Sequence, residues 1–327
     1  MKTAYNYRQI ISKALSDEMN HDPDVILFGE DVAAAGGAFK TTPGLFEEFG
    51  RNRVRDTPIS EQAIVGAALG SAMTGLRPVA EIMFADFAGV SFDQIANQVA
   101  KYRYMTNGQV EVPLVIRMAN GAGSGFGAQH SQSAENWFLN IPGLKIVTPA
   151  TVSDLYGLLR GSIRDNNPVL FFEHKNLFSI KGEVEGTEAE ILPLGQANVV
   201  RPGRDITVVA NQQMLHRSLE AAYVLEGEGI SLEVIDPRTI VPFDDATVIE
   251  SLQRTSRLLV VQEGSHDGSW GSALASRMIS QNFELFDAAP QVLSSLPSPV
   301  PYAGNLEELW LVSVAHIVET ARRQFHY

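Results

Sequence analysis

The chain has 327 residues, of which 45% are hydrophobic and 19% charged, enough for a sizeable core and a length that suits two domains. With 38 Asp and Glu against 25 Lys and Arg, its formal net charge is -13, which argues against nucleic-acid binding. The absence of cysteine excludes disulfides, thiolate metal sites and a cysteine nucleophile. Without a signal peptide or an apolar run of membrane-spanning length, we expect a cytoplasmic protein with no membrane role.

The first part of the chain alternates between helical and strand-like segments. A helix is expected over residues 7–20, and the apolar run at 25–29, which ends in glycine, predicts a buried parallel strand. Further strands are predicted over residues 78–83, 112–117, 144–147 and 169–172, with helices over 61–76, about 90–103 and from about 151. This alternation indicates an α/β fold with a doubly wound parallel sheet, whose ligands bind beyond the carboxyl ends of the strands.

A change of character follows at residues 175–203, which are polar and carry several glycines, as is typical of a linker. Beyond it, strands are predicted over residues 205–210, 230–235 and 258–262, with helices over 215–226, 271–282 and 306–324. We therefore expect two α/β domains, the first over residues 1–190 and a smaller second one over 200–327.

Glu61 stands at the start of a helix that is rich in small residues. Ser60 is a good N-cap, so Glu61 would lie in the first turn, where backbone N–H groups and the helix dipole favour a carboxylate. Such an acid can act on a ligand, although most first-turn acids only complement the dipole. Gly66 and Gly70, four residues apart in this helix, indicate close helix packing.

A loop over residues 120–133 carries four glycines and His130. Its glycine spacing does not fit the dinucleotide-binding fingerprint, and Ser124 has its glycines one residue away, where a hydrolase nucleophile elbow needs them two residues away. A single histidine is more often structural than catalytic, and the other histidines show no metal-ligand spacing. For the charged residues 173–175, a solvated strand end is favoured over a role in a site.

Seven segments, taken in order, resemble one family: Gly-Glu-Asp-Val at 29–32, Arg-Asp-Thr-Pro-Ile-Ser-Glu at 55–61, Phe-Ala-Asp-Phe at 84–87, Phe-Asp-Gln-Ile at 92–95, Ala-Gln-His-Ser-Gln at 128–132, Ile-Arg-Asp-Asn-Asn-Pro at 163–168 and Ser-Pro-Val-Pro-Tyr-Ala at 298–303. The chain resembles the β subunit of the thiamine-diphosphate-dependent component of 2-oxo acid dehydrogenase complexes, acetoin dehydrogenase relatives included. The resemblance runs from about Tyr7 to the C-terminus. It implies a pyrimidine-binding domain followed by a domain like the C-terminal domain of transketolase.

The resemblance also implies roles for individual residues. Glu61 matches the glutamate that hydrogen-bonds a pyrimidine ring nitrogen of thiamine diphosphate and so activates the cofactor, which carries the carbanion chemistry. Phe87 matches the aromatic residue that stacks on the pyrimidine, and Ile59 and Glu30 match neighbouring cofactor contacts. His130 resembles the active-site histidine that transfers protons or receives the incoming lipoyl group.

A monovalent-cation site is implied in the same way. In several relatives backbone carbonyls hold such an ion, for example K⁺, and stiffen the surrounding region. The matching residues here are Leu114, Ser162, Ile163, Asp165 and Asn167.

One family motif is missing from the sequence. The Gly-Asp-Gly motif with its later Asn, which holds the diphosphate and Mg²⁺, does not occur in the chain. The resemblance therefore implies an α subunit that holds the Mg²⁺, an active site formed between chains, and a heterotetramer of two α and two β subunits. The second domain would serve assembly and docking to the lipoylated acyltransferase core.

The expected activity is that of a 2-oxo acid or acetoin dehydrogenase that transfers an acyl group to lipoyl groups. The segments at 84–87 and 171–177 resemble the acetoin or branched-chain branch more than the pyruvate branch, and acetoin is favoured. Two alternatives stay open: a transketolase-like subunit for carbon–carbon transfer, and a non-catalytic scaffold subunit, against which the presence of both Glu61 and His130 argues.

Overall fold

The structure is a computed structural model that describes residues 2–326. The chain divides into two compact units. The first comprises the residues up to Asn120 together with Trp137–Leu194, and the second comprises Gly121–Asn136 together with the residues from Gly195 on. A stretch of chain from within the first half therefore belongs with the C-terminal part.

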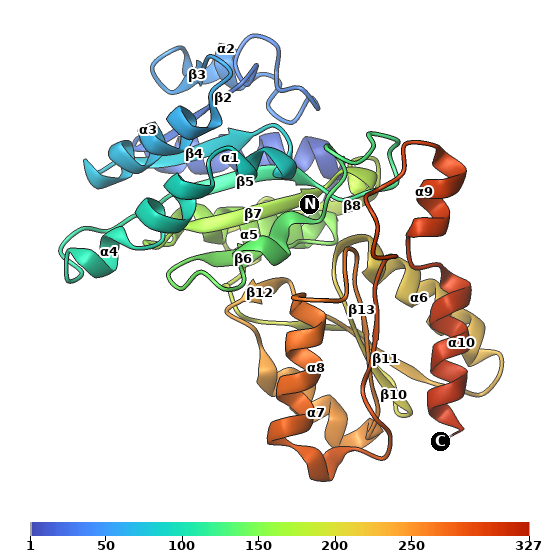
Figure 1. The fold of residues 1–327 in the computed structure, drawn as a ribbon. Helices are drawn as coiled ribbons and strands as arrows, with labels where there is room; N and C mark the ends of the chain where they lie inside the picture. The colour runs from blue at the N-terminus through green and yellow to red at the C-terminus, as the bar shows by residue number, and fades with distance from the viewer. Residues whose placement is uncertain (1, 327) are drawn as a thin grey trace. The chain divides into compact units, whose positions relative to one another are not determined.

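The first unit is built on a parallel sheet (Figure 1). Its strands follow the order β6-β7-β5-β4-β2-β3, and every pair along this order is parallel. Their bounds are β2 Val25–Gly29, β3 Val54–Asp56, β4 Arg77–Ile82, β5 Val115–Asn120, β6 Lys145–Val147 and β7 Val169–His174. Separately, β1 (Thr3–Asn6) pairs with β8 (Lys181–Val184) in an antiparallel ribbon. The predicted doubly wound parallel sheet is confirmed.

Helices cover both faces of this sheet. The buried side chains of α1 (Tyr7–His21) and α5 (Val152–Arg164) form one apolar cluster with alternate residues of the strands, such as Leu27 and Phe171. Of the described residues, those of α3 (Glu61–Met73) stay outside that cluster and pack against β4 instead. The shorter helices of this unit are α2 (Leu45–Phe49) and α4 (Tyr102–Met105).

The second unit contains a mixed sheet of order β14-β13-β10-β11-β9, in which only β9 is antiparallel to its neighbour. The strands of this unit are β9 Asn198–Arg201, β10 Ile206–Ala210, β11 Leu232–Asp236, β12 Thr239–Val241, β13 Leu258–Val261 and β14 Gln291–Leu293. Its helices are α6 Gln212–Glu226, α7 Asp245–Thr255, α8 Trp270–Gln281, α9 Gly304–Trp310 and α10 Val314–Phe325. Within residues 2–326, no helix has both the length and the apolar character needed to cross a membrane.

Three sequence predictions were wrong in detail. The polar segment 175–203 is not a bare linker, because β8 and β9 lie within it and pair at the edges of sheets. The helix expected over 306–324 is two helices, since Leu311 is extended and the Ser313 side chain caps α10. The helix expected over about 90–103 is irregular, with a π-helical stretch at Gln94–Val99 before α4.

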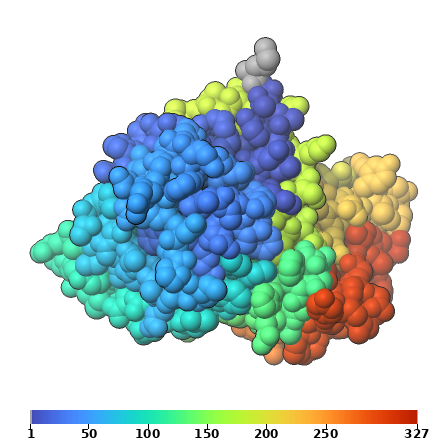
Figure 2. Space-filling model, turned by 90° about the horizontal axis from the view of Figure 1, so that it is seen from above, coloured from blue at the N-terminus to red at the C-terminus, as the bar shows by residue number. Residues whose placement is uncertain are grey.

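Close packing at the small residues of α3 was also predicted; within this chain Gly66 lies beside the π-helical stretch Gln94–Val99, but Gly70 has no such neighbour. A Cβ added to Gly70 would meet nothing within 4 Å, and one added to Gly66 would first meet the Gln94 Oε1 atom at 3.5 Å. Ala63 and Ala67 on the same helix are exposed. In Figure 2 the blue and light-blue residues of the segment from β2 to α3 form much of the face in view. One apolar stripe of α3 is therefore left uncovered by its own chain.

Two glycine substitutions should act in opposite directions on stability. A Cβ at Gly29, the last residue of β2, would lie 2.7 Å from the Glu81 carbonyl oxygen, so Gly29→Ala should lower the free energy of unfolding by about 1–3 kcal/mol through overpacking. Gly70→Ala adds its methyl group in open space within a helix and should raise the free energy of unfolding by about 0.5–1 kcal/mol. Urea unfolding of the purified chain measures both, and equal effects would contradict the packing at Gly29.

Candidate active site

Two carboxylates are buried at the carboxyl edge of the parallel sheet. Glu30 directly follows β2, Glu61 begins α3, and each side chain is only 7% exposed. Burial, followed by the negative charges of Glu61, Asp31 and Glu81, raises the pKa of Glu30 above its ordinary value. The structure thus brings Glu30 and Glu61 close enough for their charges to interact, and places Glu61 in the first helical turn as predicted.

These carboxylates lack hydrogen-bond donors in their own chain. The Glu30 Oε1 atom and the nearby Thr57 hydroxyl are buried without a hydrogen-bond partner among the described residues. No hydrogen bond or ion pair joins the Glu61 carboxylate to any residue in the described part of the chain. Ser60 holds the N-cap position, but its side chain makes no capping hydrogen bond, so its predicted capping role was wrong. The Glu30 and Glu61 carboxylates are therefore available to donors from outside the chain.

Apolar side chains stand on neighbouring loops of the same unit. Phe87 lies in the short turn Ala85–Gly89 after β4, where its ring packs edge-on against Phe84 with the centroids 5.4 Å apart. Phe87 is partly exposed, and Ile59, two residues before Glu61, is 82% exposed. Buried acceptors, a partly exposed aromatic ring and an exposed aliphatic side chain together suit a flat heterocycle that carries N–H groups.

A buried cluster of charged side chains joins the central strands β4, β5 and β7 of the same sheet, and the sequence analysis did not predict it. The Arg117 guanidinium, 1% exposed, donates from Nη1 to Glu81 Oε2 at 2.8 Å, and from Nε and Nη2 to Glu173 at 2.7 and 3.0 Å. Burial opposes the charge of Arg117, but the carboxylates of Glu173 and Glu81 outweigh it and raise its pKa. Glu81 also accepts from the Thr41 hydroxyl at 3.3 Å.

The prediction that residues 173–175 form a solvated strand end was wrong, because Glu173 is buried in this cluster. The available signal was the presence of Glu81 and Arg117 inside two apolar strands. A charge in the middle of a central parallel strand has to be paired with another charge.

His130 lies in the second unit, in a loop without helix or strand. Its side chain is half-buried, and its backbone N–H donates to the Gly127 carbonyl at 3.3 Å. Gly123 and Gly125 of this loop have φ angles of +93° and +74°, a left-handed backbone that favours glycine. The four glycines of the sequence pattern therefore shape a loop and do not form a phosphate cradle of the known type.

The five residues of the expected cation site lie in the first unit, around the end of α5 and the start of β5. The Arg77 Nη1 atom donates to the carbonyls of Ile163 and Asp165 at 3.0 and 3.3 Å, and the Leu114 and Ser162 carbonyls accept backbone N–H groups. Each carbonyl oxygen has a second lone pair, but Arg77 already places a positive charge beside the Ile163 and Asp165 carbonyls. Arg103 donates to the Asn167 side chain at 2.8 Å. Across residues 2–326, no group of three or more His, Asp or Glu side chains is arranged to hold a metal.

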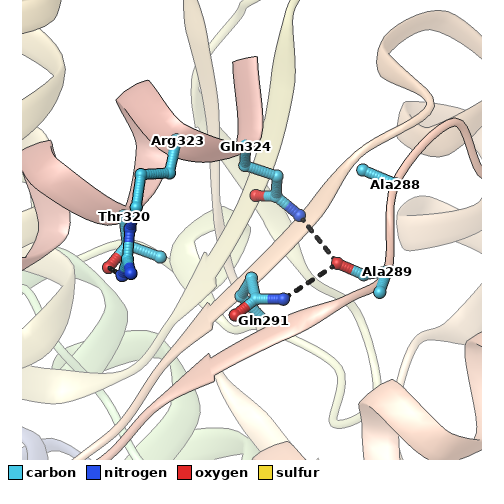
Figure 3. Close-up of a pocket in the computed structure, with 6 residues that line it drawn as sticks. All are labelled: Ala288, Ala289, Gln291, Thr320, Arg323 and Gln324. Atoms are coloured by element: carbon cyan, nitrogen blue, oxygen red, sulfur yellow. Dashed lines mark hydrogen bonds between the residues drawn. The ribbon is translucent and has the colours of Figure 1, made fainter. Parts of the chain in front are cut away.

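A pocket of about 320 Å³ lies elsewhere, between α10 and the edge strand β14 (Figure 3). The Gln324 Nε2 atom donates to the carbonyls of Leu258 and Ala289 at 2.9 and 3.3 Å, and Gln291 donates to the same Ala289 carbonyl at 3.3 Å. These amides tie the C-terminal helix to the sheet edge. None of the candidate site residues named in the preceding paragraphs lines this pocket, so it is no part of the candidate site.

The raised pKa of Glu30 predicts a pH-dependent stability. The folded chain keeps the Glu30 proton to higher pH than the unfolded chain, so the free energy of unfolding falls as the pH rises from the ordinary pKa of 4.5 through the raised one. Glu30→Gln should remove this loss: it should stabilise the purified chain at neutral pH and have no such effect below about pH 4. Urea unfolding across this range measures it, with Glu183→Gln on the exposed side of β8 as control. If the free energy of unfolding varied with pH in the same way in the wild type and in Glu30→Gln, the raised pKa of Glu30 would be contradicted.

Comparison with known proteins identifies both parts of the chain. Residues 3–181 match the family described as transketolase, pyrimidine binding domain, and residues 195–317 match transketolase, C-terminal domain. The chain is similar in structure to a split gene transketolase in an inactive beta4 tetramer, with a TM-score of 0.80, 23% identity and 98% of each chain covered, which shows the fold.

Close sequence relatives cover almost the whole chain. The acetoin:2,6-dichlorophenolindophenol oxidoreductase subunit beta of Cupriavidus necator is 46% identical, covering 96% of this chain and 95% of that protein. The subunit of the same name from Bacillus subtilis is 42% identical, covering 94% of this chain and 93% of that protein. The pyruvate dehydrogenase E1 component subunit beta of Rhizobium meliloti is 44% identical, covering 96% of this chain and 68% of that protein. The chain therefore belongs to the family of E1-type β subunits that these pyruvate dehydrogenase and acetoin oxidoreductase proteins represent, built from transketolase pyrimidine-binding and C-terminal domains.

Proposed function

We propose that this chain is the β subunit of a thiamine-diphosphate-dependent oxidoreductase that acts on acetoin or a 2-oxo acid and passes an acyl group to a lipoyl acceptor. Relatives that are 41–46% identical over nearly the whole of this chain, named as β subunits of acetoin and pyruvate enzymes, support the reaction class. The observation that carries the proposal is the pair of buried acids at the carboxyl edge of the sheet: Glu30 has a buried oxygen without a partner, and Glu61 makes no hydrogen bond to the described residues.

In this proposal the chain supplies the pyrimidine half of the cofactor site. Thiamine diphosphate, when bound, supplies the carbanion chemistry. Glu61 would share a proton with a ring nitrogen of the pyrimidine, donating to that nitrogen as the acid and accepting from it once the proton has moved, and Glu30 would accept a hydrogen bond from the same cofactor. Phe87 stacks on the ring, and Ile59 shields it from water. His130 would transfer a proton as the lipoyl group binds.

A partner α chain completes the site in this proposal. The sequence lacks the Gly-Asp-Gly motif for the diphosphate and Mg²⁺, so those contacts come from the partner, in a heterotetramer of two α and two β subunits that docks on a lipoylated acyltransferase core. The uncovered stripe of Ala63, Ala67 and Gly70 and the 82% exposed Ile59 support burial against another chain. A domain boundary near residues 190–200, a K⁺ ion at the Ile163 and Asp165 carbonyls and a cytoplasmic location belong to the same proposal.

Acetoin is the favoured substrate within this class. The highest identity among the relatives compared, 46%, is to an acetoin oxidoreductase subunit, although pyruvate dehydrogenase subunits follow at 44%. Carbon–carbon transfer of the transketolase type is the alternative; the transketolase that matches in structure shares only 23% identity, so it supports the fold and not that reaction.

A substrate panel separates these possibilities. The chain, reconstituted with the α chain of its own organism and thiamine diphosphate, should turn over acetoin at least tenfold faster than pyruvate or branched 2-oxo acids. The measurement uses both a lipoylated domain and 2,6-dichlorophenolindophenol as acceptors. Preference for pyruvate would revise the substrate alone, whereas ketol transfer between sugar phosphates without a lipoyl acceptor would refute the dehydrogenase proposal.

Replacement of Glu61 tests the central residue. Glu61→Gln should lower kcat by about 10²–10⁴, the range of general acid–base catalysis, because the amide cannot hold the proton. The variant should fold normally, since the carboxylate has no partner in its own chain. Glu47→Gln provides the matched control, because Glu47 also lies in the first turn of a helix but is exposed. Near-normal turnover of Glu61→Gln with unchanged circular dichroism would contradict the proposed role.

A further inference from the structure

The loop that carries His130 is held by two buried carboxylates of the C-terminal part of the chain. Glu263 stands two residues after β13, and Glu307 lies in α9. Their side chains are 4% and 2% exposed, and the segment Gly121–Asn136 belongs with them in one compact unit. Loop and carboxylates are far apart in the sequence but form one packed structure.

Glu307 binds the glycine turn of this loop. Its Oε1 atom accepts the Gly123 N–H at 2.7 Å, and its Oε2 atom accepts the Gly125 N–H at 2.9 Å. Both glycines have positive φ angles, so their N–H groups turn toward the same carboxylate. Hydrogen bonds from backbone N–H groups to a buried carboxylate are charge-assisted and strong, and they offset the cost of burying its charge.

Glu263 joins the two ends of the loop. A single carboxylate oxygen, Oε1, accepts the Ala122 N–H at 2.6 Å and the Ser133 hydroxyl at 2.8 Å. Beyond the loop, the Trp270 N–H donates to the Asn136 side chain at 3.0 Å. His130 therefore lies between two anchored points, in a stretch whose backbone has no helix or strand to order it.

We propose that Glu307 and Glu263 are positioning residues that fix the His130 loop within the second unit. This inference rests on the role proposed above for His130. Glu307 touches neither substrate nor cofactor in this scheme and acts only through the loop backbone. An imidazole displaced by about 1 Å loses about 10²-fold in proton transfer, so anchoring of this kind affects turnover.

The first test measures order in the loop. In the assembled α and β complex, amide hydrogen exchange of peptides covering residues 121–133 should become at least tenfold faster in Glu307→Gln, because the neutral amide retains one acceptor oxygen and loses the charge. Glu308→Gln is the control: Glu308 lies on the same helix, but its side chain is exposed and pairs with Arg217 at 2.8 Å. Unchanged exchange in Glu307→Gln would overturn the anchoring.

The second test is a double-mutant cycle with His130. Glu307→Gln should lower kcat with a lipoylated acceptor by about 10- to 100-fold when His130 is present, and by less than twofold in a His130→Ala background. Additive losses would show a general structural effect and overturn the positioning role. Glu307→Asp, which keeps the charge but is one methylene shorter, serves as the second variant if Glu307→Gln folds poorly, and the same cycle applies.

Failure of the two proposals can be told apart. If His130→Ala alone keeps full activity, the role of His130 is refuted, and the exchange measurement still decides whether Glu307 orders the loop. If His130→Ala is impaired but Glu307→Gln is not, the positioning role is refuted while the role of His130 stands. Glu263→Gln should repeat the Glu307 pattern, because it loosens the other end of the same loop.

Discussion

Burying a carboxylate without a hydrogen-bond donor costs free energy, and this cost is the main physical constraint at the candidate site. Glu30 and Glu61 lie at the carboxyl edge of the parallel sheet and are each 7% exposed; Glu30 Oε1 is buried without a hydrogen-bond partner among the described residues, and the Glu61 carboxylate makes no hydrogen bond to them. A protein that folds only for its own stability would pair such groups or leave them in water. Their burial is the observation on which the proposed cofactor site rests.

Other buried acids in the chain show the contrast. Glu81 and Glu173 share the Arg117 guanidinium, and Glu263 and Glu307 accept backbone N–H groups. Each of these acids is satisfied by a partner in the same unit, so each stabilises a local arrangement. The distinction between satisfied and unsatisfied buried acids separates supporting residues from candidate ligand contacts, and burial by itself does not.

Chain order and spatial order differ in a way that matters for function. The segment Gly121–Asn136 follows a strand of the first unit, yet its Ala122 and Gly123 N–H groups donate to acids from the C-terminal part of the chain. Its glycine pattern predicts the turns of the loop, but it does not predict that the Glu307 carboxylate binds them. The loop that carries the histidine is bonded to acids more than a hundred residues away in sequence.

The sequence by itself determined the fold class, the buried strands and the family, because hydrophobic periodicity and contiguous motifs are local properties. It also placed Glu61 in the first turn of α3. It did not predict the edge strands β8 and β9, whose polar residues resemble a linker, or the absence of packing at Gly70. The pairing of Arg117 with Glu173 and the anchoring of the His130 loop by Glu307 were decided by tertiary structure alone. Such contacts join residues distant in sequence, and their donor and acceptor geometry exists only once the chain has folded.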